Sequence, residues 1–350
     1  MNPTFFSICI PQHNRTSFLL KELEAFSKQT FQDFELCISD DCSTDGRANE
    51  IVKYLEKSGM RYRFKQLERN GRYDVNLRSA IGLATGRYCL LMGNDDLPAE
   101  AETLAQLNGE LEKHQWPEAA ITNYRELSSG RTFLRVPHTV DLGSGAHVAA
   151  ANFRNLSFVS GIILDRALAQ QHATEKWDGT AMYQMYLCSR IVAAGGRLLA
   201  INRVAILKDI QIPGEAVDSY AKRPVLKKCP IVERPLNLAP LGLLAFDAVE
   251  PYIPPGRRDS FGRRIFLQLL LFTFPPWIIE YRKIQSWRYA LGICLGMRPR
   301  NLLRSLNFGA ATTSLLKIVY GLVCVAGLSV PVTLFEKVKP QLHRLAKASR

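Results

Sequence analysis

The chain has 350 residues, 47% of them hydrophobic and 22% charged, with a formal net charge of +13. This length and apolar content predict one large α/β domain with an appendage, and they suffice for a sizeable core. The eight cysteines form no CxxC pair, and three of them lie within apolar runs, so neither a zinc site nor a disulfide framework is expected. The first residues, MNPTFFSICIP, do not have the pattern of a secretory signal.

The positive charge is concentrated in the last hundred residues. Residues 251–350 carry 16 Lys and Arg against 3 Asp and Glu, whereas residues 1–125 carry 15 against 18. This asymmetry indicates a polyanionic partner, either nucleic acid or an anionic membrane surface. Such a partner does not explain the function of the amino-terminal part, whose net charge is slightly negative.

Strand-like and helix-like segments alternate over the first 125 residues. We predict strands at residues 6–10 (ending at Pro11), 34–38, 62–67, 88–92 and 119–122. We predict helices at residues 17–28 and 74–84. A third helix is expected to follow a cap at Thr44 or Asp45, and a fourth is expected to open with Pro98 as its first residue. The apolar runs indicate strands that are covered on both faces, which predicts a doubly wound, mainly parallel sheet flanked by helices.

The pattern is less regular after residue 125. Residues 158–164 and 198–201 are expected to be strands, and residues 180–194 a helix that ends at Gly195-Gly196. Prolines then become frequent, and apolar runs alternate with basic pairs. We therefore predict a first domain over residues 1–225 and a basic, mainly helical, membrane-associating region over residues 226–350.

Carboxylates follow two of the predicted strands, at the edge where ligands bind in such sheets. Asp95 and Asp96 follow an apolar strand, and adjacent carboxylates suit Mn²⁺ or Mg²⁺, which also take phosphate oxygens from a substrate. Asp40 and Asp41 can accept hydrogen bonds from a nucleoside. Turn formation and helix capping are the alternative roles for both pairs.

These segments resemble the family 2 inverting glycosyltransferases, which have the GT-A fold. The resemblance lies in SICIPQHNR (7–15), FELCISDDCSTDG (34–46), NG (70–71), ATGRY (84–88) and MGNDD (92–96). Within that family, GTAMYQ (179–184) and the basic carboxyl terminus look most like the O-antigen sugar transferases such as abequosyltransferase.

The resemblance implies a role for each matching residue. Asp40 and Asp41 would bind the base and ribose of a nucleotide-sugar donor, His13 would lie against the base, and Arg72 would approach the diphosphate. Asp95 would hold the divalent metal, with Asp96 beside it. We assign the remaining matching residues, Pro11, Asn14 and Asn94, to the same donor site.

Two positions depart from the family pattern. Gly93 stands where the metal motif often begins with an aspartate, so Asp95 carries more of the metal assignment. Gln184 stands where the family places the aspartate that acts as general base, and an amide does not accept a proton near neutral pH. The nearest carboxylate is Asp178, which could instead cap a helix, and Glu175 is a second candidate base.

Two apolar runs in the basic region have charged flanks. Residues 265–279 are interrupted by Pro275-Pro276, and residues 318–335 contain Pro331. Both runs are short for a straight span of the bilayer, so we expect membrane association without a full span; one true span, or helices packed on the catalytic domain, are the alternatives. The region has no zinc spacing or helix-turn-helix signal, so no nucleic-acid partner is expected.

The prediction is therefore a metal-dependent glycosyltransferase at the cytoplasmic face of the membrane, peripheral or monotopic, with a lipid-linked glycan as acceptor. The alternative is a catalytically inactive protein that binds nucleotide sugars or acts as a membrane-associated scaffold.

Overall fold

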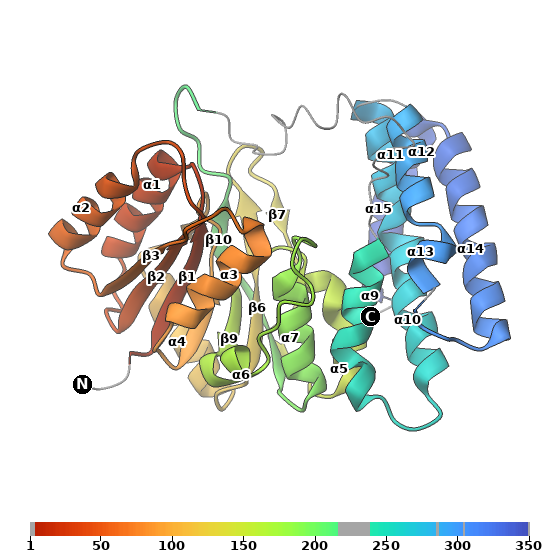
Figure 1. The fold of residues 1–350 in the computed structure, drawn as a ribbon, viewed down its shortest axis with the longest axis horizontal. Coiled ribbons are helices and arrows are strands. Elements are labelled where there is room, and N and C mark those ends of the chain that lie inside the picture. The colour runs from red at the N-terminus through yellow and green to blue at the C-terminus, as the bar shows by residue number, and fades with distance from the viewer. Residues whose placement is uncertain (1–3, 216–238, 285–286, 304, 349–350) are drawn as a thin grey trace. The chain divides into compact units, whose positions relative to one another are not determined.

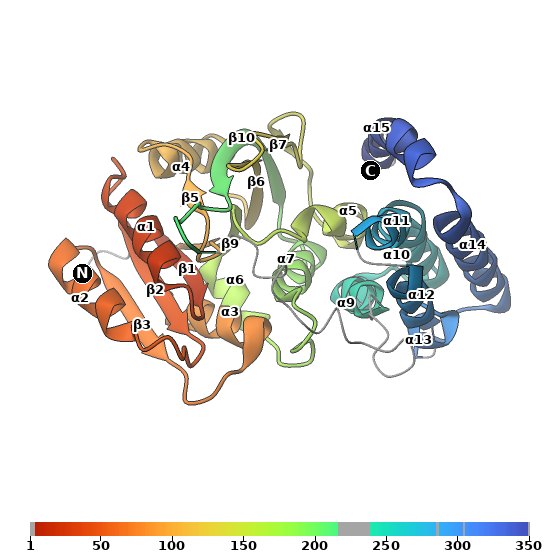
Figure 2. The same ribbon diagram turned by 90° about the horizontal axis from the view of Figure 1, so that it is seen from above.

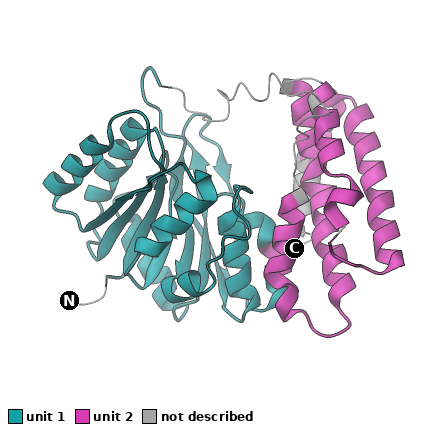
Figure 3. Cartoon of the chain, viewed as in Figure 1, with its two compact units in different colours: residues 1–149, 153–219 teal, residues 150–152, 220–350 magenta. Residues whose placement is uncertain are grey.

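The computed structural model describes residues 4–215, 239–284, 287–303 and 305–348 (Figure 1). The chain forms two compact units, one of residues 1–149 and 153–219 and the other of residues 150–152 and 220–350 (Figure 3). The predicted domain boundary at residues 225 and 226 lies outside the described residues.

A mixed sheet forms the centre of the first unit, as the α/β prediction requires. Its order, over the described residues, is β3-β2-β1-β4-β9-β6-β10-β5, with β7 beside β6 and β8 beside β10. β1 pairs in parallel with β2 and β4, whereas β9 runs antiparallel to both β4 and β6. The strands are β1 Phe6–Gln12, β2 Phe34–Asp40, β3 Tyr62–Gln66, β4 Tyr88–Leu91, β5 Leu97–Pro98, β6 Ala119–Glu126, β7 Thr132–Phe133, β8 Val140–Asp141, β9 Ile162–Asp165 and β10 Leu198–Lys208.

Helices cover both faces of this sheet (Figures 1 and 2). They are α1 Thr16–Ser27, α2 Ala48–Ser58, α3 Arg72–Leu83, α4 Thr103–Lys113, α5 Ala146–Asn152, α6 Arg166–Gln171 and α7 Tyr183–Ala193, with a 3-10 turn at Phe153–Leu156. Helices α1, α2 and α4 share one apolar core with the sheet, in which Leu23, Leu55 and Leu107 are fully buried. Helices α3, α6 and α7 contact one another on the other face. The central strands β1, β2 and β4 are thus buried on both sides, as their apolar runs predicted.

Pro11 lies inside β1 and does not end it. The Cys9 carbonyl accepts a hydrogen bond from the Met92 N–H at 3.0 Å, so residues 9 and 11 both turn their backbone groups toward β4. That strand ends at Leu91, and β1 continues beside β2 alone. The missing N–H of proline therefore removes no ladder hydrogen bond.

Pro98 does not open a helix. It lies in β5, paired with Ile206 of β10 at the end of the sheet, where a missing N–H is tolerated. Helix α4 begins five residues later, at Thr103.

The expected cap of α2 and the expected start of α7 also differ from the structure. Arg47 occupies the cap position of α2, because the Thr44 N–H donates to Asn14 Oδ1 and is drawn toward the β1 loop. Helix α7 begins at Tyr183 and not at Thr180, since Ala181 has a φ of +58° that no helix accommodates.

The second unit is helical, in agreement with the prediction. Its elements are α9 Ala239–Val249, a 3-10 turn at Glu250–Tyr252, α10 Arg258–Phe272, α11 Phe274–Ile284, α12 Trp287–Gly296, α13 Pro299–Leu303, α14 Ala310–Ser329 and α15 Val332–Ala348. Each predicted apolar run is divided between two helices, next to Pro275 in one case and at Pro331 in the other. Among the described helices, α14 is the one whose length and composition would allow it to cross a membrane.

Candidate donor and metal site

The loops after β1, β2 and β4 meet at one edge of the sheet, because β1 lies between the other two strands and all three are parallel. Gln12, the last residue of β1, is level with Asp40 of β2. Its side-chain oxygen accepts a hydrogen bond from Asn94 Nδ2 at 2.6 Å. The residues predicted at three separate strand ends are thereby brought to one place.

Asp40 and Asp41 are both buried, and both organise the loops around them. Asp40 accepts hydrogen bonds from the Ser43 N–H at 3.2 Å and from Gln66 Nε2 at 3.0 Å. Asp41 Oδ1 accepts from the Gly71 N–H at 2.6 Å, immediately before α3. The carboxylates thus fix the loops that surround the predicted nucleoside pocket.

His13, Asn14 and Arg72 lie around this pair. His13 Nδ1 is 3.0 Å from the Asp41 carbonyl oxygen. Asn14 Oδ1 accepts from the N–H groups of Thr44 and Asp45 and so holds the β2–α2 loop. Arg72 is exposed at the first turn of α3, with a φ of +65°, a backbone strain that often marks functional positions.

Asp95 forms an ion pair with Arg15. Arg15 Nη1 lies 2.6 Å from Asp95 Oδ2, and the Asp95 side chain is 23% exposed. The guanidinium also lies 4.1 Å from the centre of the Phe18 ring, which fixes its position. Burial raises the pKa of Asp95, although Arg15 opposes this effect.

Asp96 is buried and hydrogen-bonded on both oxygens. Ser160 Oγ donates to Oδ2, and the Asp209 N–H donates to Oδ1 at 3.2 Å. Ser160 Oγ also accepts from the Gly93 N–H at 2.8 Å, and the Ser160 carbonyl accepts from Arg135 Nη2 at 2.6 Å. Burial and the neighbouring Asp95 raise the pKa of Asp96 well above the ordinary range. Asp95 is therefore the more accessible of the two predicted metal ligands.

Glu22 on α1 adds a further carboxyl group that the sequence analysis did not identify. Its side chain is fully buried, and neither oxygen has a hydrogen-bond partner among the described residues. Burial, followed by the charges of Asp96 and Asp95, raises its pKa well above the ordinary value. The edge of the sheet therefore holds an excess of acidic groups.

A divalent cation would fit the charge of this cluster. Glu22, Asp95, Asp96 and Asp209 interact electrostatically, while the ion pairs to them in the described structure come from Arg15 and Lys208. No group of three or more acidic, histidine or cysteine side chains is preassembled for a metal within the described residues. Mg²⁺ and Mn²⁺ commonly bind through one or two carboxylates plus substrate phosphates, and Asp95 meets that requirement.

Gln184 lies at the start of α7 and is buried. Its Oε1 accepts from Tyr73 Oη at 3.0 Å, and its Nε2 donates to the Ser157 carbonyl at 2.9 Å. Asp74 holds the same segment, since it accepts from the N–H groups of Ala181 and Tyr183. The beginning of α7 is thus fastened to the beginning of α3, which carries Arg72.

The two candidate carboxylate bases differ strongly in environment. Asp178 receives two hydrogen bonds from Arg78, at 2.5 and 2.9 Å, so its charge is compensated. It does not cap α7; Met182 occupies that cap position, and Asp74 binds the N–H groups there. Glu175 is 86% exposed and lies 3.6 Å from the same guanidinium. Of the two, Asp178 has the more defined position.

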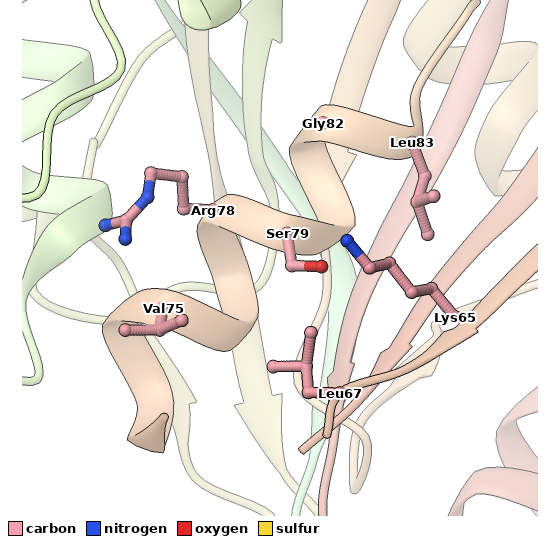
Figure 4. A pocket seen from close by; sticks show the side chains of 7 residues that line it. All are labelled: Lys65, Leu67, Val75, Arg78, Ser79, Gly82 and Leu83. Carbon is pink, nitrogen blue, oxygen red and sulfur yellow. The ribbon is translucent and has the colours of Figure 1, made fainter. Parts of the chain in front are cut away.

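A separate pocket of about 320 Å³ lies between α3 and the edge strand β3 (Figure 4). The Lys65 ammonium and the Ser79 hydroxyl point toward each other across it. None of the predicted donor or metal residues lines this pocket.

The mixed sheet flanked by helices resembles the GT-A fold of solved structures. The S. aureus TarS fragment 1–349 in complex with UDP is similar over 96% of this chain and 91% of its own, with a TM-score of 0.60 and 15% identity. The mannosyltransferase PcManGT from Pyrobaculum calidifontis, in complex with GDP-Man and Mn²⁺, is similar over 99% of this chain and 86% of its own, with a TM-score of 0.53 and 16% identity.

Part of the sequence matches a family model. Residues 7–155, less than half of the chain, match the model of glycosyl transferase family 2. The abequosyltransferase RfbV of Salmonella typhimurium is 31% identical over 134 residues, which are 38% of this chain and 39% of RfbV. A PGL/p-HBAD biosynthesis glycosyltransferase of Mycobacterium bovis is 33% identical over 115 residues, 33% of this chain and 44% of the relative. The chain thus spans less than half the length of these curated relatives.

Proposed function

We propose that the chain is a metal-assisted, inverting glycosyltransferase that transfers a sugar from a nucleotide-diphosphate sugar to a lipid-linked glycan. The observation that carries this proposal is the convergence of Asp40, Asp41 and Asp95 at one sheet edge within a family 2 domain. The nucleotide and nucleotide-sugar complexes of the structural neighbours support a donor of this class.

The chain's own residues account for donor binding. Asp40 and Asp41 would accept hydrogen bonds from the base and ribose, and His13 would lie against the base. Arg72, exposed at the start of α3, would contact the diphosphate. Asp95 would hold Mn²⁺ or Mg²⁺ with Asp96 behind it, and the cation would stabilise the charge on the departing nucleoside diphosphate.

In this reaction an acceptor hydroxyl attacks the anomeric carbon while the bond to the diphosphate breaks. The hydroxyl proton must pass to a base. Asp178 is our first candidate and Glu175 the second, and Gln184, held by Tyr73 and Ser157, would position the acceptor. Inversion follows from a single displacement on the face opposite the leaving group.

We further propose that the enzyme works at the cytoplasmic face of the membrane on a lipid-linked acceptor. The excess of 16 basic over 3 acidic residues in positions 251–350 supports attraction to anionic lipid. The similarity to an abequosyltransferase supports a glycan acceptor of the O-antigen type.

The test is transfer from a panel of nucleotide sugars with Mn²⁺ to membranes containing lipid-linked glycans. We expect one donor to be consumed with release of its nucleoside diphosphate, and chelation to stop the reaction. A second candidate function is an inactive binding protein, which the amide of Gln184 at the base position favours. Donor binding without turnover in the same panel would support that alternative.

A further inference from the structure

Helix α14 has one face packed within the helical unit. Thr312, Leu316, Val323 and Gly327 are buried on this face. Helices α10 and α11 contact it, and a Cβ placed on Gly327 would lie only 2.8 Å from Ile278 of α11. One side of the helix is therefore packed within its unit, and α14 lies at one margin of that unit in Figures 1 and 2.

The opposite face of α14 is apolar and exposed. Leu315, Ile318, Leu322 and Val325 are 39%, 62%, 66% and 65% exposed. Their spacing of three, four and three residues places them on one stripe of the helix. Single exposed apolar residues need no explanation, but a continuous stripe marks an interaction surface. These four residues are called the α14 stripe below.

The helical unit that carries the α14 stripe is basic. On the packed side of α14, Arg263 of α10 donates to Thr312 Oγ1, and Arg282 of α11 donates to the carbonyls of Gly327 and Val330 at the end of the helix. Lys317 is exposed on the helix itself. Between residues 281 and 350 the sequence has a single acidic residue, Glu336, which faces Lys283 and Lys339.

This charge distribution decides between the possible occupants of the stripe. A second copy of the chain would bring a second set of basic groups against the first, and like charges repel. An anionic bilayer offers phosphate groups to the basic residues and acyl chains to the leucines.

An in-plane position fits α14 better than a span. Lys317 would enter the hydrocarbon if the helix crossed the bilayer, as would the ion pair of Glu280 with Lys339 on the packed neighbours. With 100° between successive residues, Lys317 lies roughly 120° from the centre of the stripe. It can therefore reach the headgroups when only the stripe is buried.

We propose that the α14 stripe is the membrane-docking surface of this protein, and that α14 lies in the plane of an anionic bilayer with this stripe in the acyl boundary. The inference rests on the proposed function only for its location at a membrane. Vesicle binding and sugar transfer can be measured separately, so either can fail without the other.

The experiment uses the full chain and vesicles of phosphatidylcholine, with or without phosphatidylglycerol. We expect cosedimentation with the anionic vesicles and release by alkaline carbonate, as for an in-plane helix. Leu322→Glu and Ile318→Glu should each weaken binding by about tenfold or more, because they place a carboxylate among acyl chains. The control, Leu134→Glu, changes a leucine of the first unit that is 44% exposed, and should bind as the wild type does.

Three results would overturn the inference. They are unchanged vesicle binding by both stripe variants, resistance of the bound wild type to carbonate, and a wild-type dimer that Leu322→Glu converts to a monomer without loss of vesicle binding. Retained nucleotide binding in the variants shows that the first unit is folded. Vesicle binding without any sugar transfer would contradict the proposed function and leave the inference standing.

Discussion

Arg15 Nη1 lies 2.6 Å from Asp95 Oδ2 and so joins the loop after β1 to the turn after β4. The pair compensates one charge in a cluster that also contains Glu22, Asp96 and Asp209. It orients Asp95 while the second carboxylate oxygen of Asp95 faces Gly93. A cation bound by Asp95 would therefore meet a ligand that is already held in place.

The first prediction concerns the metal. Asp95→Ala should lower sugar transfer by at least about a hundredfold, because the charge of the leaving group is no longer compensated. Binding of the nucleotide should lose its dependence on Mn²⁺ in titration calorimetry. Full activity of this variant, with native far-ultraviolet circular dichroism, would remove Asp95 from the metal site.

The second prediction concerns the nucleoside pocket. Asp41→Ala removes the acceptor of the Gly71 N–H, and we expect nucleotide binding to weaken by about 1–3 kcal/mol. The control is Asp33→Ala, which removes an exposed carboxylate just before β2. Equal affinities of the two variants in titration calorimetry would contradict the assignment.

The third prediction separates a base from a structural ion pair. Asp178→Asn should lower kcat by at least about a hundredfold, as expected for loss of a general base. Arg78→Gln removes only the partner and should have a smaller effect on kcat. Equal losses would assign Asp178 a structural role, and a loss confined to Glu175→Gln would transfer the base to that residue.

The fourth prediction concerns Glu22 and pH. Burial holds the folded-state pKa of Glu22 above the ordinary value of 4.5. Between these two pKa values, the folded protein keeps a proton that the unfolded chain has released. The free energy of unfolding should fall as pH rises from about 4.5, with a slope of up to about 1.4 kcal/mol per pH unit from this group. Urea denaturation of Glu22→Gln should show a shallower decline; parallel profiles would contradict the burial argument.

The sequence predicted where the strands before Asp40 and Asp95 end, because local patterns encode the strand boundaries. These strands are mainly apolar, with Glu35 as the charged exception, and such strands must be covered on both faces. The parallel order of β1, β2 and β4 then brings the two carboxylates together. The helical character of the described residues between 239 and 348 could be predicted from the long apolar runs there.

Other parts of the site have no local signal. The sequence alone indicates that Glu22 is a polar residue on an amphipathic helix. Its burial results from the packing of α1 on the sheet. Ser160 and Asp209 are distant in sequence from Asp96 and reach it through β9 and the end of β10. The reversal of β9 could not be predicted either, since a short apolar run has the same composition in both directions.

The most direct test of the central claim is the release of a nucleoside diphosphate from a nucleotide sugar, measured for the wild type and for Asp95→Ala with Mn²⁺ and membrane-bound acceptor. The account predicts release by the wild type that is coupled one to one with incorporation of sugar into the lipid fraction, and loss of both in Asp95→Ala. Absence of release by the wild type with every donor, or equal release by Asp95→Ala, would contradict it.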